Sequence, residues 1–127
     1  MVIFPSMESK EIIKYILPKE FVEYFDLVKI EGSETQLVLH LDEKAKYPPE
    51  HAEKDLESKG FTDPVHLHDF PIRDHQVLLR VRRRKWRDKT TGETYTRDWD
   101  IKHEGTRYTK EFAAFLKKMF RHQTGKR

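Results

Sequence analysis

The sequence predicts an α+β domain in which short N-terminal helices, two antiparallel β-hairpin regions and a C-terminal amphipathic helix pack together. Three observations predict this fold class. Apolar residues recur with helical spacing near both ends of the chain, they alternate along its middle, and turn residues separate the alternating segments. A chain of 127 residues suits one domain. We expect it at residues 8–121, between flexible, little-structured ends at residues 1–7 and 122–127.

The N-terminal part of the chain predicts two short helices. Residues 8–17 have helical spacing of their apolar side chains, which we expect to face inward at Ile12, Ile13, Ile16 and Leu17. Pro18 then interrupts the pattern, because proline suits the first turn of a helix and not its interior. The second helix would carry Phe21, Val22, Tyr24 and Phe25. Met1 and Met7 are both candidate starts of translation.

A change of period after the helices predicts the first hairpin. Residues 27–31 and 35–41 flank a turn at Gly32 and Ser33, and Leu37, Leu39 and Leu41 alternate onto one face. Residues 42–60 are polar and contain two consecutive prolines. They are expected to form a long loop with at most one helical turn.

The second β region contains a strand at residues 65–70, a turn, a long strand at residues 76–87 and a return strand at residues 93–99. Two registers fit the loop that ends at Gly92. A three-residue loop places Arg87 opposite Tyr95, and a two-residue loop places Trp86 there. We favour the first because it gathers five apolar residues on one face. These residues are Val77, Leu79, Val81, Tyr95 and Trp99.

The last predicted element is a helix that begins at about Thr109. Its apolar residues follow the i, i+3, i+4, i+7, i+8 pattern of a buried helical stripe, at Phe112, Phe115, Leu116, Met119 and Phe120. Thr109 is suited to cap the helix, and Glu111 lies in the first turn, where the helix dipole favours an acid.

Charge divides the chain into two halves. Residues 1–72 contain 8 Lys and Arg against 15 Asp and Glu, whereas residues 73–127 contain 17 against 7. A net charge of +10 in the second half predicts binding to a polyanion such as nucleic acid. The alternative is that the acidic half neutralises the basic half within the fold.

Within the basic half, six of the eight residues from 80 to 87 are cationic. Phosphates would relieve the repulsion among these charges, and arginine also stacks on bases. The alternative is a solvated strand face paired with nearby aspartates. Charge alone does not separate DNA from RNA. The candidate DNA contacts are Arg82, Arg84, Lys85, Trp86, Arg87, Arg97, Arg107 and Lys110.

Several classes of function have no support in the sequence. The chain has no cysteine, no glycine-rich phosphate loop and no nucleophile motif, so we predict no catalytic residues and no cofactor. His66 and His68 share a strand face, but no further ligand stands at zinc-motif spacing, and no metal is expected. No apolar run is long enough to span a bilayer and no secretory signal is visible, so we expect a cytoplasmic protein.

The order of several motifs resembles the N-terminal region of bacterial insertion-sequence transposases, in particular a Bacteroidetes type with this region encoded as its own short reading frame. The resemblance spans about residues 8–121. It is carried by Glu8-Ser9-Lys10-Glu11-Ile12, Ile16-Leu17-Pro18, Tyr24-Phe25-Asp26, Leu56-Glu57-Ser58-Lys59-Gly60-Phe61, Asp69-Phe70-Pro71-Ile72-Arg73, the Arg-rich strand and Thr106-Arg107-Tyr108-Thr109-Lys110-Glu111-Phe112.

The resemblance implies a DNA-binding region that recognises or anchors the terminal inverted repeats of an element for a separate catalytic DDE polypeptide. The wider family has a zinc-ribbon-like module with knuckle cysteines, which are missing here, so zinc is not implied. The family also continues into a helix-turn-helix and the DDE domain beyond the elements present here, so catalysis is not implied either. Two rivals stay open. One is a module that docks the catalytic subunit without binding DNA, and the other is an RNA-binding or regulatory domain.

Overall fold

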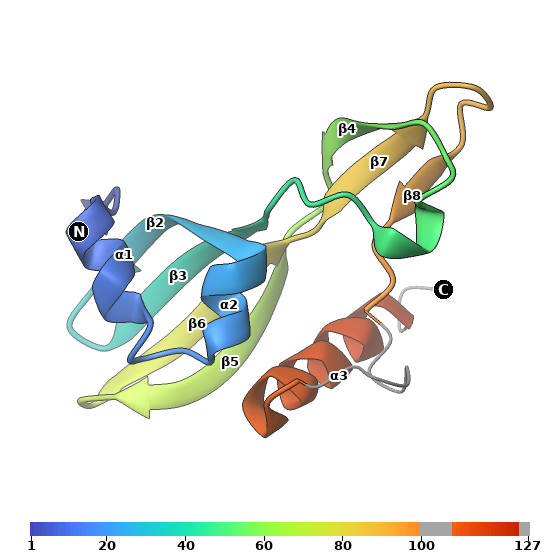
Figure 1. Cartoon of the computed structure of the whole chain (residues 1–127). Coiled ribbons are helices and arrows are strands. Elements are labelled where there is room, and N and C mark those ends of the chain that lie inside the picture. The colour runs from blue at the N-terminus through green and yellow to red at the C-terminus, as the bar shows by residue number, and fades with distance from the viewer. Residues whose placement is uncertain (100–107, 125–127) are drawn as a thin grey trace.

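The computed structural model describes residues 1–99 and 108–124 and has the predicted α+β architecture (Figure 1). Its strands form two sheets rather than separate hairpins. The first is a mixed sheet in the order β1-β2-β3-β6-β5, and the second is an antiparallel sheet in the order β4-β7-β8. The connection between β6 and β7 carries the chain from one sheet to the other.

The five-stranded sheet consists of β1 (Val2–Ile3), β2 (Phe25–Gly32), β3 (Gln36–Glu43), β5 (Val65–Ile72) and β6 (His75–Arg82). The predicted β2–β3 hairpin and the antiparallel β5–β6 pair are confirmed. The parallel pairing of β3 with β6, with Leu39 opposite Leu79, was not predicted. The long segment between β3 and β5 permits it, because parallel neighbours need a crossover connection.

The three-stranded sheet consists of β4 (Leu56–Phe61), β7 (Arg84–Asp88) and β8 (Thr94–Thr96), preceded by the short helix η1 (Pro49–His51). The expectation of a loop across residues 42–60 is wrong where β4 begins. Leu56 is its only fully buried residue, so the strand lacks the apolar alternation that reveals strands in a sequence. The long strand expected at residues 76–87 is divided at Arg83 between the two sheets.

The favoured register of the last hairpin is also wrong. Trp86 lies opposite Tyr95, and Asp88 is bonded to Glu93 through the backbone, which leaves a four-residue loop. The Asp88 carboxylate accepts hydrogen bonds from the Thr90 and Thr91 amides, and Gly92 has a φ of 80°. The turn chemistry therefore determines the register, because an aspartate that bonds to amides ahead of it closes a tight turn.

The N-terminal helices are α1 (Met7–Ile13) and α2 (Lys19–Tyr24). Ile13, Leu17 and Phe21 are buried as predicted, but Ile12 and Ile16 are exposed, and Phe25 belongs to β2. Within residues 1–7, the segment expected to be a flexible extension, β1 pairs with β2 and α1 begins at Met7.

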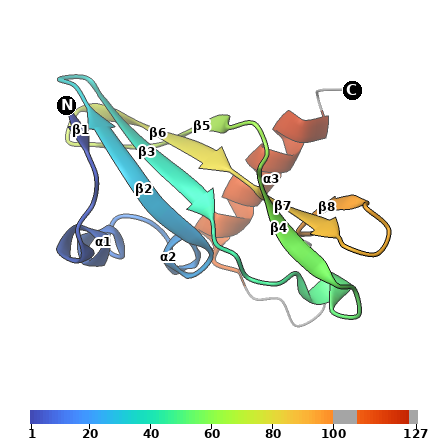
Figure 2. The ribbon, with the colours of Figure 1, turned by 90° about the horizontal axis from the view of Figure 1, so that it is seen from above.

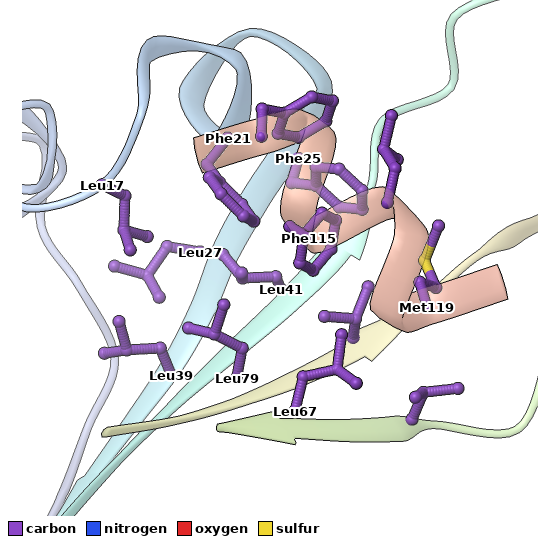
Figure 3. Packing of buried hydrophobic residues seen from close by; sticks show 14 of the residues in the cluster. Leu17, Phe21, Phe25, Leu27, Leu39, Leu41, Leu67, Leu79, Phe115 and Met119 are labelled. Atoms are coloured by element: carbon purple, nitrogen blue, oxygen red, sulfur yellow. The ribbon is translucent and has the colours of Figure 1, made fainter. Parts of the chain in front are cut away.

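The main core lies between one face of the five-stranded sheet and the helices, as Figures 2 and 3 show. The predicted C-terminal helix is confirmed as α3 (Lys110–Thr124), so it extends into the tail expected at residues 122–127. Its buried residues are Phe112, Phe115, Leu116 and Met119.

Thr109 connects the N-terminal helix α2 to the C-terminal helix α3 through hydrogen bonds. Its hydroxyl accepts a hydrogen bond from the Phe112 amide and so caps α3 as predicted. Its amide and hydroxyl both donate to the buried Glu20 carboxylate, at 2.6 and 2.9 Å. These bonds link α2 to the start of α3.

Candidate nucleic-acid interface

The face of the five-stranded sheet that points away from the main core carries most of its polar side chains; we call it the open face. Strand alternation places Val77, Leu79 and Val81 in the core, so Arg80 and Arg82 point to the open face. Pairing of the strands extends each of these positions into a row across the sheet. One row contains Lys29, His40, Arg80 and His66, and the next contains Asp26, Asp42 and Arg82.

His40 is the most buried member of the first row and connects the strands around it. Its Nε2 is 2.5 Å from Oε1 of Glu31, and its Nδ1 is 3.3 Å from an Arg80 nitrogen. A guanidinium only donates and a carboxylate only accepts, so Nδ1 accepts and Nε2 carries the proton. Burial lowers the pKa of His40, and the Lys29 and Arg80 cations add to the effect against Glu31. The ring is therefore held in its neutral form.

Arg82 and Arg84 meet at one aromatic ring where the open face passes into the small sheet. Their guanidinium carbons lie 4.3 and 4.6 Å from the centroid of the Phe61 ring. Arg82 also makes two hydrogen bonds to the Asp42 carboxylate, at 2.7 and 2.6 Å. Arg84 donates to the Glu43 carbonyl and to the Ser58 hydroxyl. Both guanidiniums are thus held in place, and each keeps further N–H donors.

Arg83 has a different role from its neighbours, because its side chain is buried at the junction of the two sheets. It donates to the Arg97 carbonyl at 2.7 Å, and the Arg97 guanidinium lies over the Tyr24 and Trp99 rings. Burial lowers the pKa of Arg83 and raises that of nearby Glu43, although their opposite charges oppose both shifts. Arg97, a predicted DNA contact, is therefore part of this junction.

The small sheet accounts for three more predicted contacts. Trp86 is 5% exposed and packs against the Tyr47 ring, so its side chain belongs to the core of the small sheet, and its contact to DNA stays a prediction. The Arg87 guanidinium pairs with Glu57 at 2.8 Å, and both side chains are 41% exposed. Lys85 is half-buried and, within residues 1–99 and 108–124, has no ion-pair partner.

The two remaining predicted contacts are not brought to the open face. Lys110 is exposed on α3, which packs on the opposite side of the sheet. Arg107 lies outside the described residues.

Sequence reasoning missed three residues that belong to this surface: Lys29, Arg80 and Phe61. Arg80 was visible in the Arg-rich run, and its place between the buried Leu79 and Val81 on β6 marks it as outward-facing. Lys29 and Phe61 come from other strands, and only the pairing of those strands brings them to the arginines.

Among the residues that the structure describes, no group of three or more potential ligands is placed to hold a metal ion. The described helices include none with the length and apolar character needed to cross a membrane. Comparisons of the chain with protein families, with curated proteins and with solved structures find no match. Any function must therefore be argued from the chain's own residues.

Proposed function

We propose that this chain binds nucleic acid, with duplex DNA as the first candidate, through the open face and the Arg82–Phe61–Arg84 stack. The observation that carries the proposal is the pair of guanidiniums held over one ring, next to Arg80, which points to the same face of β6 as Arg82. Side chains that are already ordered lose little entropy when they bind a ligand. Phosphate oxygens suit them because guanidinium forks match their geometry.

The surface favours contacts to the phosphate backbone over contacts to bases. A sheet face with half-buried side chains presents no helix or ribbon to a DNA groove, and contacts to phosphate carry no direct sequence information. The chain would then position DNA for another polypeptide and would not itself catalyse a reaction. The resemblance to transposase N-terminal regions makes the terminal inverted repeats of an element the first duplex to test.

A salt titration of fluorescence anisotropy tests the proposal. Three phosphate contacts, from Arg80, Arg82 and Arg84, would give a slope of log K against log salt of about −2.7, at about −0.9 for each contact. Each Arg→Gln change at positions 80, 82 and 84 should reduce the slope by about 0.9. Arg73→Gln is the matched control, because Arg73 lies in the exposed turn between β5 and β6, at the far end of β6 from Arg82.

Three results would separate the alternatives. If the variant that combines Arg80→Gln, Arg82→Gln and Arg84→Gln keeps the salt slope of the parent chain, the open face is not the DNA surface. Equal binding to repeat and scrambled duplexes would leave DNA binding in place and remove site recognition. Tighter binding to structured RNA than to duplex DNA would favour the RNA-binding rival.

A second candidate function, docking of a protein partner without DNA binding, is favoured by the apolar side chains exposed near the N-terminus. Absence of DNA binding at low salt, together with binding to a catalytic polypeptide that persists at high salt, would support it over the DNA proposal.

A further inference from the structure

The first sixteen residues expose an unusual amount of apolar surface for a chain in which 37% of residues are charged. Eight of the ten large apolar side chains exposed in the described residues belong to this segment. Tyr15 is 90% exposed and Ile12 is 61% exposed. Singly scattered apolar residues are ordinary, whereas a contiguous group marks a surface that binds another molecule.

A hollow of about 490 Å³ adjoins this segment on the helical side of the five-stranded sheet. Its deepest lining residues are buried members of the main core, Phe21, Leu67, Leu79 and Phe115, which are labelled together in Figure 3. Tyr15 and Ile16, from the turn after α1, and Ala114 of α3 also line it. The volume is in the range of sites that accept a ligand or a large side chain.

The rim of the hollow carries two carboxylates from different elements, Asp69 on β5 and Glu111 on α3. Within the described part of the chain, neither carboxylate has a hydrogen-bond or ion-pair partner. Among the described residues that line the hollow, Lys118 is the one with an ammonium group, which donates to the His68 carbonyl at 3.5 Å. An apolar hollow beside two unpaired carboxylates is complementary to an apolar group that carries a nearby cation.

The apolar surface continues beyond the hollow along α1. The Tyr15 amide donates to the Ile12 carbonyl, so the turn that follows α1 keeps these residues three apart on one side. The exposed surface therefore extends from the hollow over Ile16 and Tyr15 to Ile12, which is farther than one small molecule in the hollow would reach. An amphipathic segment of a protein has the required length, with one side chain in the hollow and others against α1.

We infer that this hollow and the exposed side of α1 dock a basic amphipathic segment of a protein partner. An apolar anchor side chain occupies the hollow, and adjacent Lys or Arg residues lie against Asp69 and Glu111. The docking surface lies on the opposite side of the sheet from the open face, so the inference does not rest on DNA binding. Both ligands fit the chain at the same time.

The test uses the full chain and two fluorescein-labelled helical peptides, one of Leu, Phe and Lys and one with every Lys replaced by Glu. Anisotropy should show that the Lys peptide binds at least about tenfold more tightly than the Glu peptide. Asp69→Asn with Glu111→Gln should reduce this preference to less than about threefold. Ala114→Phe should weaken binding of the Lys peptide by about tenfold or more, because the added ring fills the hollow.

Lys117→Phe is the control, since it adds the same ring on α3 at an exposed position that does not line the hollow. A thermal midpoint of Ala114→Phe equal to that of the parent shows that the fold is intact. Ala114→Phe should leave the DNA salt slope unchanged, so failure here and failure of the proposed function remain distinguishable. Equal binding of the two peptides, no binding of the Lys peptide, or undiminished binding by Ala114→Phe would each overturn the inference.

Discussion

The two sheets of this protein are stabilised by different means. The five-stranded sheet shares a core of seventeen buried apolar residues with the helices. The three-stranded sheet buries only two large apolar side chains outside that core, Leu56 and Trp86. The continuous segment formed by β6 and β7 contributes to both sheets. In the large sheet, β6 places Val77, Leu79 and Val81 in the core, and in the small sheet β7 buries Trp86.

Polar contacts replace apolar burial in the small sheet. The Tyr47 hydroxyl donates to the Lys54 carbonyl and accepts from the Leu56 amide. Arg87 pairs with Glu57 across β7 and β4. Hydrogen bonds contribute about 1 kcal/mol each, much less than a buried large side chain. The comparison implies that the small sheet opens more readily than the large one, and that the arginines between them lie next to the less stable region.

The largest expected effect comes from the large core. Leu116→Ala should lower the free energy of unfolding by about 2–5 kcal/mol, and Phe115→Ala by about 3–5 kcal/mol, because each leaves a cavity under the sheet. Urea denaturation followed by circular dichroism measures both. Ala113→Gly is a smaller helix perturbation, with an expected cost of at most about 1 kcal/mol. Losses below about 0.5 kcal/mol for both core variants would show that this stripe is not packed as described.

Trp86→Ala should affect mainly the small sheet. In a core that unfolds as one unit, the cavity left by Trp86→Ala would lower the free energy of unfolding by about 3–5 kcal/mol. If the small sheet opens separately, the free energy of global unfolding falls by no more than the free energy of opening that sheet. Amide hydrogen exchange should accelerate in β4, β7 and β8 and stay slow in β3 and β6. Trp86→Phe should retain most of the protection. Equal acceleration in both sheets would mean that the chain unfolds as one unit.

A pH dependence should arise from the large sheet through His40. Its folded pKa is lowered, so the native state binds fewer protons than the unfolded chain. The contribution of His40 to the free energy of unfolding is fully present above the unfolded pKa of about 6.5. It is lost as pH falls through the lower folded pKa, at a slope of at most about 1.4 kcal/mol per pH unit. Urea midpoints of the parent and of His40→Gln, measured from pH 7.5 downward, should diverge. Parallel pH profiles would contradict this role.

The smallest expected effect concerns DNA affinity at the boundary of the two sheets. Asp42 neutralises Arg82, so Asp42→Asn should strengthen DNA binding about fivefold at low salt, which corresponds to about 1 kcal/mol for one charge at 4 Å in water. Glu57→Gln, which frees Arg87 in the small sheet, is the matched comparison. A larger gain from Glu57→Gln than from Asp42→Asn would move the DNA surface from the open face to the small sheet.

Much of the fold was accessible from patterns within single segments. The stripe from Phe112 to Met119 predicted α3, and alternation predicted the β2–β3 hairpin. The same reasoning failed for β4, which has almost no apolar pattern. It also failed for the register between β7 and β8, which is determined by the hydrogen bonds of Asp88 in the loop between them. The candidate site was predicted in part: the Arg-rich run was visible, but its division into open-face, buried and paired arginines was not.

The sequence by itself determined the helices and strands whose apolar residues recur on one side and pack into a single core. It also determined the split of charge along the chain and the density of arginine in one strand. Only the tertiary structure decided that β3 and β6 pair in parallel, that Trp86 and Arg83 are buried, and that Phe61 comes to lie beneath Arg82 and Arg84. The physical reason is that periodicity reports which side of an element is apolar. The partner of each charged side chain depends on strands distant in sequence, and their register is a property of the whole sheet.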